Sequence, residues 1–264
     1  EVALKTGLEQ ARLRAHQLTI DILRAAKQAA VQGQGIPQNN VPGELQTPPS
    51  LQLLPLYAMS LMKSLALRGG QEVRLDERAF YLQLCANMSI EDSKVFIYPR
   101  MFSLHDMAAD VGIPCDVPDE TISVAGPNNV RLPAIANLSH ERLLSDGIFL
   151  METGHDLFLY IGRTVAPNFV QSLFGVQSLE GIDVTQLKIQ QDDSDYSSRV
   201  AAVVDALRAD RTRYMQLHII REGDGYAEAF FARYLVEDRA AFQGGAMSYS
   251  EYHASVVRQI AGMP

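Results

Sequence analysis

Two short runs that are apolar at nearly every position constrain the fold more than any other feature of this 264-residue chain. Gly147–Met151 and Asp156–Ile161 are separated by only four residues. A strand with apolar side chains in both directions must be buried on both faces. The two runs therefore predict adjacent strands inside a sheet, with other elements covering each face.

The rest of this half of the chain predicts a mixture of helices and strands. The expected elements are, in order, a short helix starting at Pro167 that Gly175 ends, a third strand over Leu187–Ile189, a helix capped by Ser194 or Asp195 that runs to about Arg208, and a closing helix over Tyr249–Ile260. Tyr214–Arg221 and Tyr226–Val236 flank Asp224-Gly225, a dipeptide suited to a tight primed turn, and predict a β-hairpin. This half is therefore expected to be α+β.

The beginning of the chain has a different, helical period. Over residues 2–32 apolar residues recur at steps of three and four: Leu4, Leu8, Ala11, Ala15, Leu18, Ile22, Ala25 and Ala29. Such a stripe fits either a coiled-coil partner helix or a helix packed on its own domain. Alanine fills half of the positions, which favours close packing within the domain.

Two more helices are expected before the period changes. Leu51–Leu67 carries Pro55 in its first turn, and Leu75–Met88 has Asp76 placed to cap it. A loop from Gln34 to Ser50 separates the first two helices, and Lys94–Tyr98 is expected to be extended. The predicted organisation is a helical domain with Pro-rich loops over residues 1–131, a sheet domain over 132–247, and a C-terminal helix over 248–264.

Composition and charge exclude several classes of protein. Hydrophobic residues make up 47% of the chain, which excludes general disorder. A net charge of −8 argues against a broad nucleic-acid surface. No apolar run approaches the ~18 residues needed to cross a bilayer, and no signal segment opens the chain. We therefore expect a soluble protein.

The cysteines and the first residue indicate the setting of the chain. Cys85 and Cys115 form neither a disulfide framework nor a zinc spacing, and apolar neighbours predict that Cys85 is a buried free thiol. A reducing compartment such as the cytosol fits best. The chain begins with Glu1 and reads as helix from the start, so we expect a fragment of a longer protein.

A search for catalytic patterns finds none. The sequence lacks a phosphate-binding loop, a dinucleotide fingerprint, a nucleophile elbow and a zinc-protease motif. The histidines are scattered without ligand spacing, at positions 16, 105, 140, 155, 218 and 253. Three of them precede an acid, but adjacent side chains point in different directions. No catalytic, cofactor-binding or metal-binding residue is predicted, and the chain is not expected to be an enzyme.

Two charged groups have alternative readings. Asp192, Asp193 and Asp195 suggest calcium, although helix capping accounts for them without the ordered loop that calcium requires. Four arginines form a candidate anion or lipid-headgroup patch, although helix-dipole compensation and a solvated surface explain them equally well. These are Arg199, Arg208, Arg211 and Arg213.

Several segments, taken in order, resemble one family. Ser139–Leu143, Gly147–Glu152 and Leu157–Gly162 together resemble the opening of a gelsolin-like module. With these, further segments resemble the cargo-adaptor subunit of the COPII vesicle coat: Leu53–Tyr57 with Lys63-Ser64, Asp76–Ala79, Phe96–Arg100, Leu207–Met215, Leu235–Asp238 and Gly244–Tyr249. The resemblance spans nearly the whole chain. The absence of Trp departs from the family, and Tyr160 takes the place of a strand Trp.

The resemblance implies an architecture and a role. It implies an all-helical domain, then a gelsolin-like domain with a mixed sheet flanked by helices, and a C-terminal helix that packs back near the helical part. It implies a non-enzymatic adaptor in transport from the endoplasmic reticulum to the Golgi, cytoplasmic and recruited to the endoplasmic reticulum membrane and COPII vesicles. Membrane association is then peripheral and indirect, and no nucleic acid is bound.

The resemblance also implies partners and a cofactor outside this chain. The expected partners are the GTPase-activating subunit of the coat, mainly through domains absent here, and cytosolic sorting signals of cargo proteins. No cofactor is expected in these residues, whereas a zinc ribbon is expected upstream. The alternative is a calcium-regulated actin-binding protein of the gelsolin and villin class, since the second domain alone is compatible with both.

Overall fold

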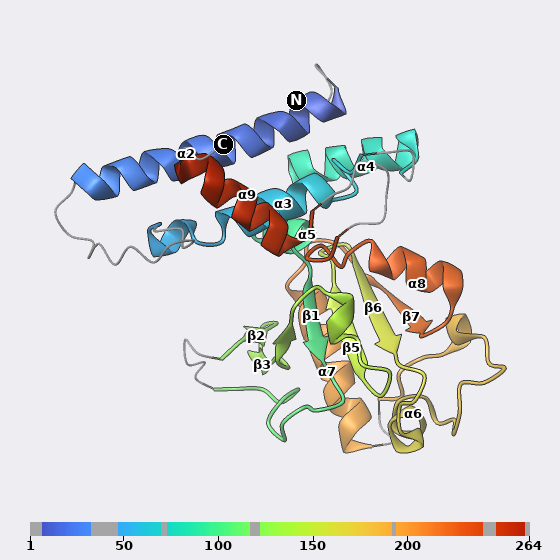
Figure 1. Cartoon of the computed structure of the whole chain (residues 1–264). Helices are drawn as coiled ribbons and strands as arrows, with labels where there is room; N and C mark the ends of the chain where they lie inside the picture. Colours follow the sequence, from blue (N-terminus) through green and yellow to red (C-terminus); the bar gives the residue numbers. More distant parts are fainter. Residues whose placement is uncertain are drawn as a thin grey trace. The chain divides into compact units, whose positions relative to one another are not determined.

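The computed structural model of the chain describes residues 7–32, 47–69, 73–116, 122–191, 194–239 and 247–261. The chain forms two compact units (Figure 1). Unit 1 combines residues 1–88 with 236–264, and unit 2 comprises residues 89–235. Unit 1 is therefore made from two stretches of chain that flank unit 2 in the sequence.

Unit 1 is helical in its described residues. Its elements are α2 (Leu8–Gln32), η1 (Pro49–Leu51), α3 (Leu54–Lys63), α4 (Leu75–Asn87) and α9 (Tyr249–Ala261). Ile20 and Leu23 of α2, Met59 of α3, and Tyr252 and Val256 of α9 form its buried apolar cluster. The closing helix thus packs against the first two helices, as the resemblance implied. The predicted loop from Gln34 to Ser50 lies mostly outside the described residues.

The helix α2 packs within its own unit, but on a face rotated from the predicted stripe. Ile20 and Leu23 are each 1% exposed, whereas Leu18 and Ile22 of the predicted stripe are 42% and 43% exposed. The neighbours α3 and α9 meet the side of the helix that carries Thr19, Ile20 and Leu23, so packing and not periodicity alone selects the buried face. The packed-helix interpretation holds, with this correction to its buried residues.

The predicted cap of α4 is wrong. The helix begins at Leu75 with Arg74 as its N-cap, and no side chain caps it. Asp76 lies inside the first turn, where its carboxylate accepts a hydrogen bond from the Glu77 N–H. By contrast, Pro55 does lie in the first turn of α3, where its missing N–H costs nothing.

Unit 2 contains a five-stranded mixed sheet with strand order β4-β1-β5-β6-β7. The strands are β1 (Arg100–Ser103), β4 (Ile135–Ala136), β5 (Ile148–Glu152), β6 (Asp156–Ile161) and β7 (Gln216–Arg221), with a separate pair β2 (Val124–Ala125) and β3 (Val130–Arg131). The helical elements are α5 (Ile90–Ile97), η2 (His140–Arg142), α6 (Pro167–Phe174), η3 (Val184–Gln186), α7 (Asp195–Ala209) and α8 (Gly225–Ala232).

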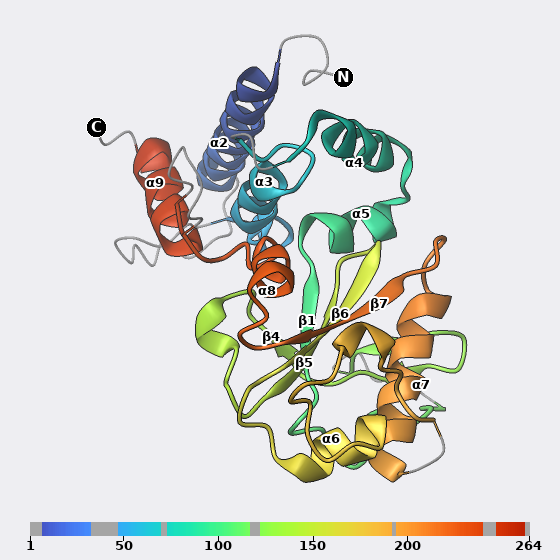
Figure 2. The ribbon, with the colours of Figure 1, turned by 90° about the vertical axis from the view of Figure 1, so that its right-hand side faces the viewer.

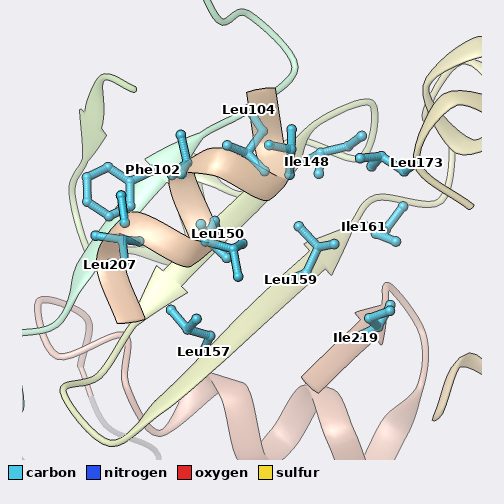
Figure 3. Close-up of a cluster of buried hydrophobic side chains, with 14 of the residues drawn as sticks. Phe102, Leu104, Ile148, Leu150, Leu157, Leu159, Ile161, Leu173, Leu207 and Ile219 are labelled. Carbon is cyan, nitrogen blue, oxygen red and sulfur yellow. The ribbon is translucent and has the colours of Figure 1, made fainter. Parts of the chain in front are cut away.

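The two apolar runs form adjacent antiparallel strands buried on both sides, as predicted. Leu157 and Leu159 of β6 face a cluster that includes Leu207 of α7 (Figure 3). On the opposite face of β6, Phe158 and Tyr160 pack against Phe231 of α8. Figure 2 shows α7 and α8 beside this sheet. Both faces are therefore covered, which explains why alternation is missing from these strands.

Two predicted helices of unit 2 are confirmed, together with their end signals. The short helix α6 starts at Pro167 and ends at Phe174. Its C-cap is Gly175, which has φ 72° in the left-handed region that glycine adopts readily. The hydroxyl of Ser194 caps α7 by accepting a hydrogen bond from the Ser197 N–H. Local capping chemistry was sufficient to place both helices.

The predicted hairpin is wrong. The strand β7 is present, but it pairs in parallel with β6, and the residues after Asp224 form α8. The return connection through α7 brings β7 beside β6, so the partner of β7 precedes it in the sequence. Two further predictions fail: Lys94–Tyr98 is largely helical, within α5, and Leu187–Ile189 is not a strand.

The boundary predicted at residue 131 also differs from the division seen in the structure. The strand β1, at Arg100–Ser103, pairs with both β4 and β5, so the sheet begins well before residue 132. Its four residues give too short a pattern to reveal a strand. The unit that holds the sheet therefore starts near Ser89.

Candidate functional site

The strongest cluster of charged groups lies inside unit 2. Four side chains make up this ionic cluster, namely Asp92, Arg100, Glu152 and Arg211. Arg100 donates from Nε and Nη2 to Glu152 Oε2, at 2.8 and 2.5 Å. Arg211 donates from Nε to Glu152 Oε1 at 2.6 Å, and its Nη1 lies 3.4 Å from Asp92 Oδ1. Two cations and two anions thus form a neutral group.

Elements distant in sequence position these four charges. Arg100 opens β1 and is directly opposite Glu152, the last residue of β5. Arg211 follows the end of α7, and Asp92 lies in the first turn of α5. Thr212 Oγ1 donates to Asp92 Oδ2 at 3.1 Å and completes the contacts of that carboxylate. The cluster therefore ties α5, the sheet and the turn after α7 together.

Burial makes the cluster structural in character. The side chains of Glu152 and Arg211 are 0% and 6% exposed. Burial lowers the pKa of Arg211, but the hydrogen bond and charge of Glu152 outweigh it and raise the pKa overall. A guanidinium held protonated between two carboxylates can neither donate nor accept a proton near neutral pH. We assign the cluster to fold stability and not to catalysis.

Unit 1 contains a buried charge of a different kind. Lys63, at the end of α3, is 3% exposed. Its Nζ donates to the carbonyl oxygens of Val236 and Asp238, at 2.7 and 2.6 Å. Burial lowers its pKa to about 8, although the nearby Asp238 carboxylate acts in the opposite direction. Lys63 thus fastens the second stretch of unit 1 to the first.

The candidate arginine patch is not an open anion site. Arg199 pairs with Asp195 and donates to two backbone carbonyls, and Arg211 is in the ionic cluster. Arg208 donates to the Met215 carbonyl, and its guanidinium lies 4.7 Å from the centre of the Tyr214 ring. Arg213 is exposed. These contacts favour the structural reading of the arginines.

Aromatic rings pack against four of the histidines, namely His16, His105, His218 and His253. One grouping of histidines with an acid was not predicted from the sequence. His155 Nδ1 lies 3.1 Å from Asp156 Oδ2, and His218 Nε2 lies 3.4 Å from Asp156 Oδ1. The His155 and Asp156 side chains therefore do meet, contrary to the argument from alternation, because a turn precedes β6. Burial lowers the pKa of His155 more than Asp156 raises it.

The remaining candidates have local explanations. Asp192 and Asp193 lie outside the described residues, and Asp195 is paired with Arg199. Within the described ranges no three His, Cys, Asp or Glu side chains are grouped to hold a metal ion. Cys85 and Cys115 are half-buried and form no disulfide, and burial raises the pKa of Cys85 to about 11. In the same part of the chain no helix has the length and apolar character needed to span a membrane.

A surface groove beside β7 is the feature that the sequence-based search missed. It has a volume of about 370 Å³ and lies between η3 and α8. Its lining is mostly apolar: Phe158, Val184, Thr185, Leu187, Gln216, Leu217, His218, Ile219, Ile220, Tyr226, Ala227 and Phe230. We call it the β7 groove. The wrong hairpin prediction hid it, because the hairpin would have covered this edge of the sheet.

The comparisons with known proteins agree with both units. A model of the Sec23/Sec24 helical domain matches residues 1–95, and a gelsolin repeat model matches residues 129–204. The transport protein SEC24 of Coccidioides immitis is 32% identical over 247 residues, which are 91% of this chain and 25% of that protein. Human Sec24C is 34% identical over 218 residues, 83% of this chain and 18% of that protein.

A solved structure extends the match to nearly every residue. The crystal structure of the human COPII-coat protein Sec24c superposes with a TM-score of 0.77 and 29% identity, over 98% of this chain and 31% of that one. The chain belongs to the Sec24 family. It spans about a quarter or less of the length of the SEC24 relatives named here. The predicted fold class, helical and then gelsolin-like, is confirmed for this Sec24 relative.

The segments that carried the Sec24 resemblance turn out to contain the buried charges. Arg100, Glu152 and Arg211 come from three of those segments, and all three meet in the ionic cluster. Lys63 and Asp238 come from two others, which meet at the Lys63 ammonium group. The segments that make this chain recognisable as a Sec24 relative therefore include residues that stabilise each unit from within.

Proposed function

We propose that this chain is part of a non-enzymatic cargo-selecting adaptor of the COPII coat, which acts by protein–protein contact in transport from the endoplasmic reticulum to the Golgi. The observation that carries the proposal is the match to a COPII-coat structure over 98% of the chain, which includes both units. Family models for the two parts support it independently.

The contacts of the charged side chains support the non-enzymatic part of the proposal. Arg211 and Glu152 are paired with each other and with Asp92 and Arg100 inside unit 2. The Lys63 ammonium group donates to two carbonyl oxygens. Catalytic acids and bases need access to a substrate in a cleft. The β7 groove has one histidine, His218, which is stacked on Phe158.

The partners and location follow from the adaptor role and are part of the proposal. We expect the GTPase-activating subunit of the coat and the cytosolic sorting signals of cargo as partners. We expect cytoplasmic protein to be recruited, peripherally and indirectly, to the endoplasmic reticulum membrane and to COPII vesicles. In a longer chain we propose a zinc ribbon upstream of these residues.

A flotation experiment tests the proposed role. The full-length protein carrying this sequence is mixed with liposomes, with and without the GTPase-activating subunit and the activated coat GTPase. We expect it to float only when the coat partner is present. Flotation of the protein by itself, or none with the partner present, would refute the proposal.

The gelsolin repeat match to residues 129–204 favours one alternative function, calcium-dependent actin binding. Sedimentation with actin filaments, in calcium and in a chelator, tests it with the same protein. Calcium-dependent pelleting would move the protein to the actin regulators, whereas equal or absent pelleting removes that alternative.

A further inference from the structure

The outer edge of β7 has backbone groups available for pairing. The Glu222 N–H bonds to the Ile161 carbonyl of β6. Backbone groups of alternate residues in a parallel ladder point the same way, so the groups of Leu217 and Ile219 face away from β6. Among the described residues, none forms a hydrogen bond with these outward N–H and C=O groups. This edge can accept another strand.

The β7 groove runs along this same edge. Tyr226, Ala227 and Phe230 of α8 form one wall, and Val184, Thr185 and Leu187, in and just after η3, form the other. Tyr226 is 84% exposed, so a large aromatic surface remains uncovered in the described structure. No Asp, Glu, Lys or Arg side chain lines the groove. The walls therefore favour apolar side chains on both sides of an added strand.

Acidic and basic side chains both flank the groove, and the Arg233 guanidinium lies 5.1 Å from the centre of the ring of the lining residue Phe230. Asp183 precedes Val184, and hydrogen bonds from Thr185 lower its pKa and keep it ionised. Asp224 precedes α8 on the other wall, and Lys188 is the neighbour of Leu187. The whole chain carries a net charge of −8. Cytoplasmic segments next to membrane spans carry an excess of Lys and Arg, which complements the net negative charge of this chain.

We infer that the β7 groove binds an extended, Lys- or Arg-flanked apolar peptide of a membrane protein's cytosolic tail, which adds to β7 as a sixth strand. This deepens the proposed adaptor role and depends on it for the source of the peptide. A strand opposite the six residues of β7 spans only about 20 Å. A stable dimer buries about 800 Å² per partner, so this groove fits a short peptide better than a second copy.

Peptide selection with edge and wall variants tests the inference. A displayed library of random dodecapeptides is panned on the immobilised chain, and enriched peptides are synthesised and measured by fluorescence anisotropy. Leu217→Pro removes an outward N–H while leaving the bonds to β6 intact. Ala227→Trp fills the groove from α8. We expect apolar sequences flanked by Lys or Arg, and at least tenfold weaker binding to each variant.

Tyr214→Ala is the matched control, since Tyr214 is 76% exposed and does not line the groove. It should change the affinity less than twofold, and N-methylated peptides should lose binding. A library that yields no binder, or binders insensitive to Ala227→Trp, overturns the inference even if Leu217→Pro fails to fold. A dimer in sedimentation that Leu217→Pro dissociates also overturns it, in favour of a second copy.

Flotation separates this inference from the proposed function. If the full-length protein floats with its coat partner but the groove binds no peptide, the inference alone is wrong. If the groove binds peptides but partner-dependent flotation fails, the adaptor role is wrong and the peptide has another source.

Discussion

The two units bury charge in opposite ways. In unit 2 two arginines and two carboxylates neutralise each other, so the ionic cluster carries no net charge. In unit 1 the Nζ of Lys63 donates to the carbonyl oxygens of Val236 and Asp238. Carbonyl dipoles satisfy hydrogen-bond donors but cannot neutralise a full charge. We therefore expect the stability of unit 2 to fall strongly when one member of the ionic cluster is removed. We expect the stability of unit 1 to depend on pH.

Arg211→Met is expected to have the largest effect. It removes the shared partner of Glu152 and Asp92. Glu152 keeps Arg100, whereas the buried Asp92 carboxylate loses its ionic partner in the cluster. Breaking a buried pair in this way costs about 3–5 kcal/mol in the free energy of unfolding. Urea denaturation measures the loss, and Arg142→Met, at an exposed position of the same unit, is the control, with a change of about 0.5 kcal/mol or less. Equal effects of the two variants would contradict the role of the cluster.

Lys63→Met should cost less and should change the pH dependence. It leaves the carbonyls of Val236 and Asp238 without their donor, which costs about 1–3 kcal/mol. Between pH about 8 and 10.5 the unfolded chain holds a proton that folded Lys63 has lost, so Lys63 makes stability rise with pH there. The variant should lack this rise.

Cys85 also changes the stability of the protein at alkaline pH, in the direction opposite to Lys63. The pKa of Cys85 rises from 9.0 to about 11 on folding, so its contribution to stability falls as pH increases above about 9. The chain with Lys63 and the Lys63→Met variant are therefore compared with Cys85→Ala present in both. The melting temperature of each is measured from pH 7.5 to 9.5. If the melting temperatures of the two proteins change with pH in the same way, the pKa of Lys63 is not lowered by folding.

The starts of two helices extend the comparison to smaller effects. In unit 1 Ser248 Oγ accepts from the Glu251 N–H, and Glu251 Oε2 accepts from the Ser248 N–H, which forms a capping box. Ser248→Ala should lower the free energy of unfolding by about 1 kcal/mol. Arg258→Ala, at an exposed position in the last turn of the same helix, serves as control. A loss no greater than that of the control would argue against the cap.

Gly225→Ala in unit 2 is expected to have the smallest effect. Gly225 opens α8, has no positive φ, and has open space where a Cβ would lie. Alanine should therefore be neutral or stabilise by up to about 1 kcal/mol. Gly223, with φ 87°, is the contrasting position, where alanine should be destabilising. Marked destabilisation at Gly225 would revive the tight-turn interpretation.

The elements predicted correctly are those whose signals lie within their own residues, and the wrong prediction concerns a pairing with a distant strand. Pro167, Gly175 and Ser194 act on their immediate neighbours, so α6 and α7 were found together with their ends. The strands β5 and β6 were found because burial on both faces of a sheet requires an apolar side chain at nearly every position. Asp224-Gly225 misled because the partner of β7 is set by the distant strand β6, which no local signal shows.

The charged residues show the same limit. Lys63, Glu152 and Arg211 look like ordinary surface residues in the sequence, and each acquires its role from a residue at least 50 positions away. The β7 groove depends on the correct partner for β7, so it could not be derived without the fold. The family resemblance pointed to several of these residues without indicating what they contact.

The discontinuity of unit 1 has a consequence for how the protein is made. During synthesis α2 and α3 emerge before unit 2, but Tyr252 and Val256, which complete their apolar cluster, emerge only after all of unit 2. Ile20, Leu23 and Met59 must therefore stay accessible while more than a hundred residues are added. Unit 2 is a continuous stretch and can fold before unit 1. Of the two units, the one whose translation starts earlier is therefore completed later, which gives chaperones a longer opportunity to bind it.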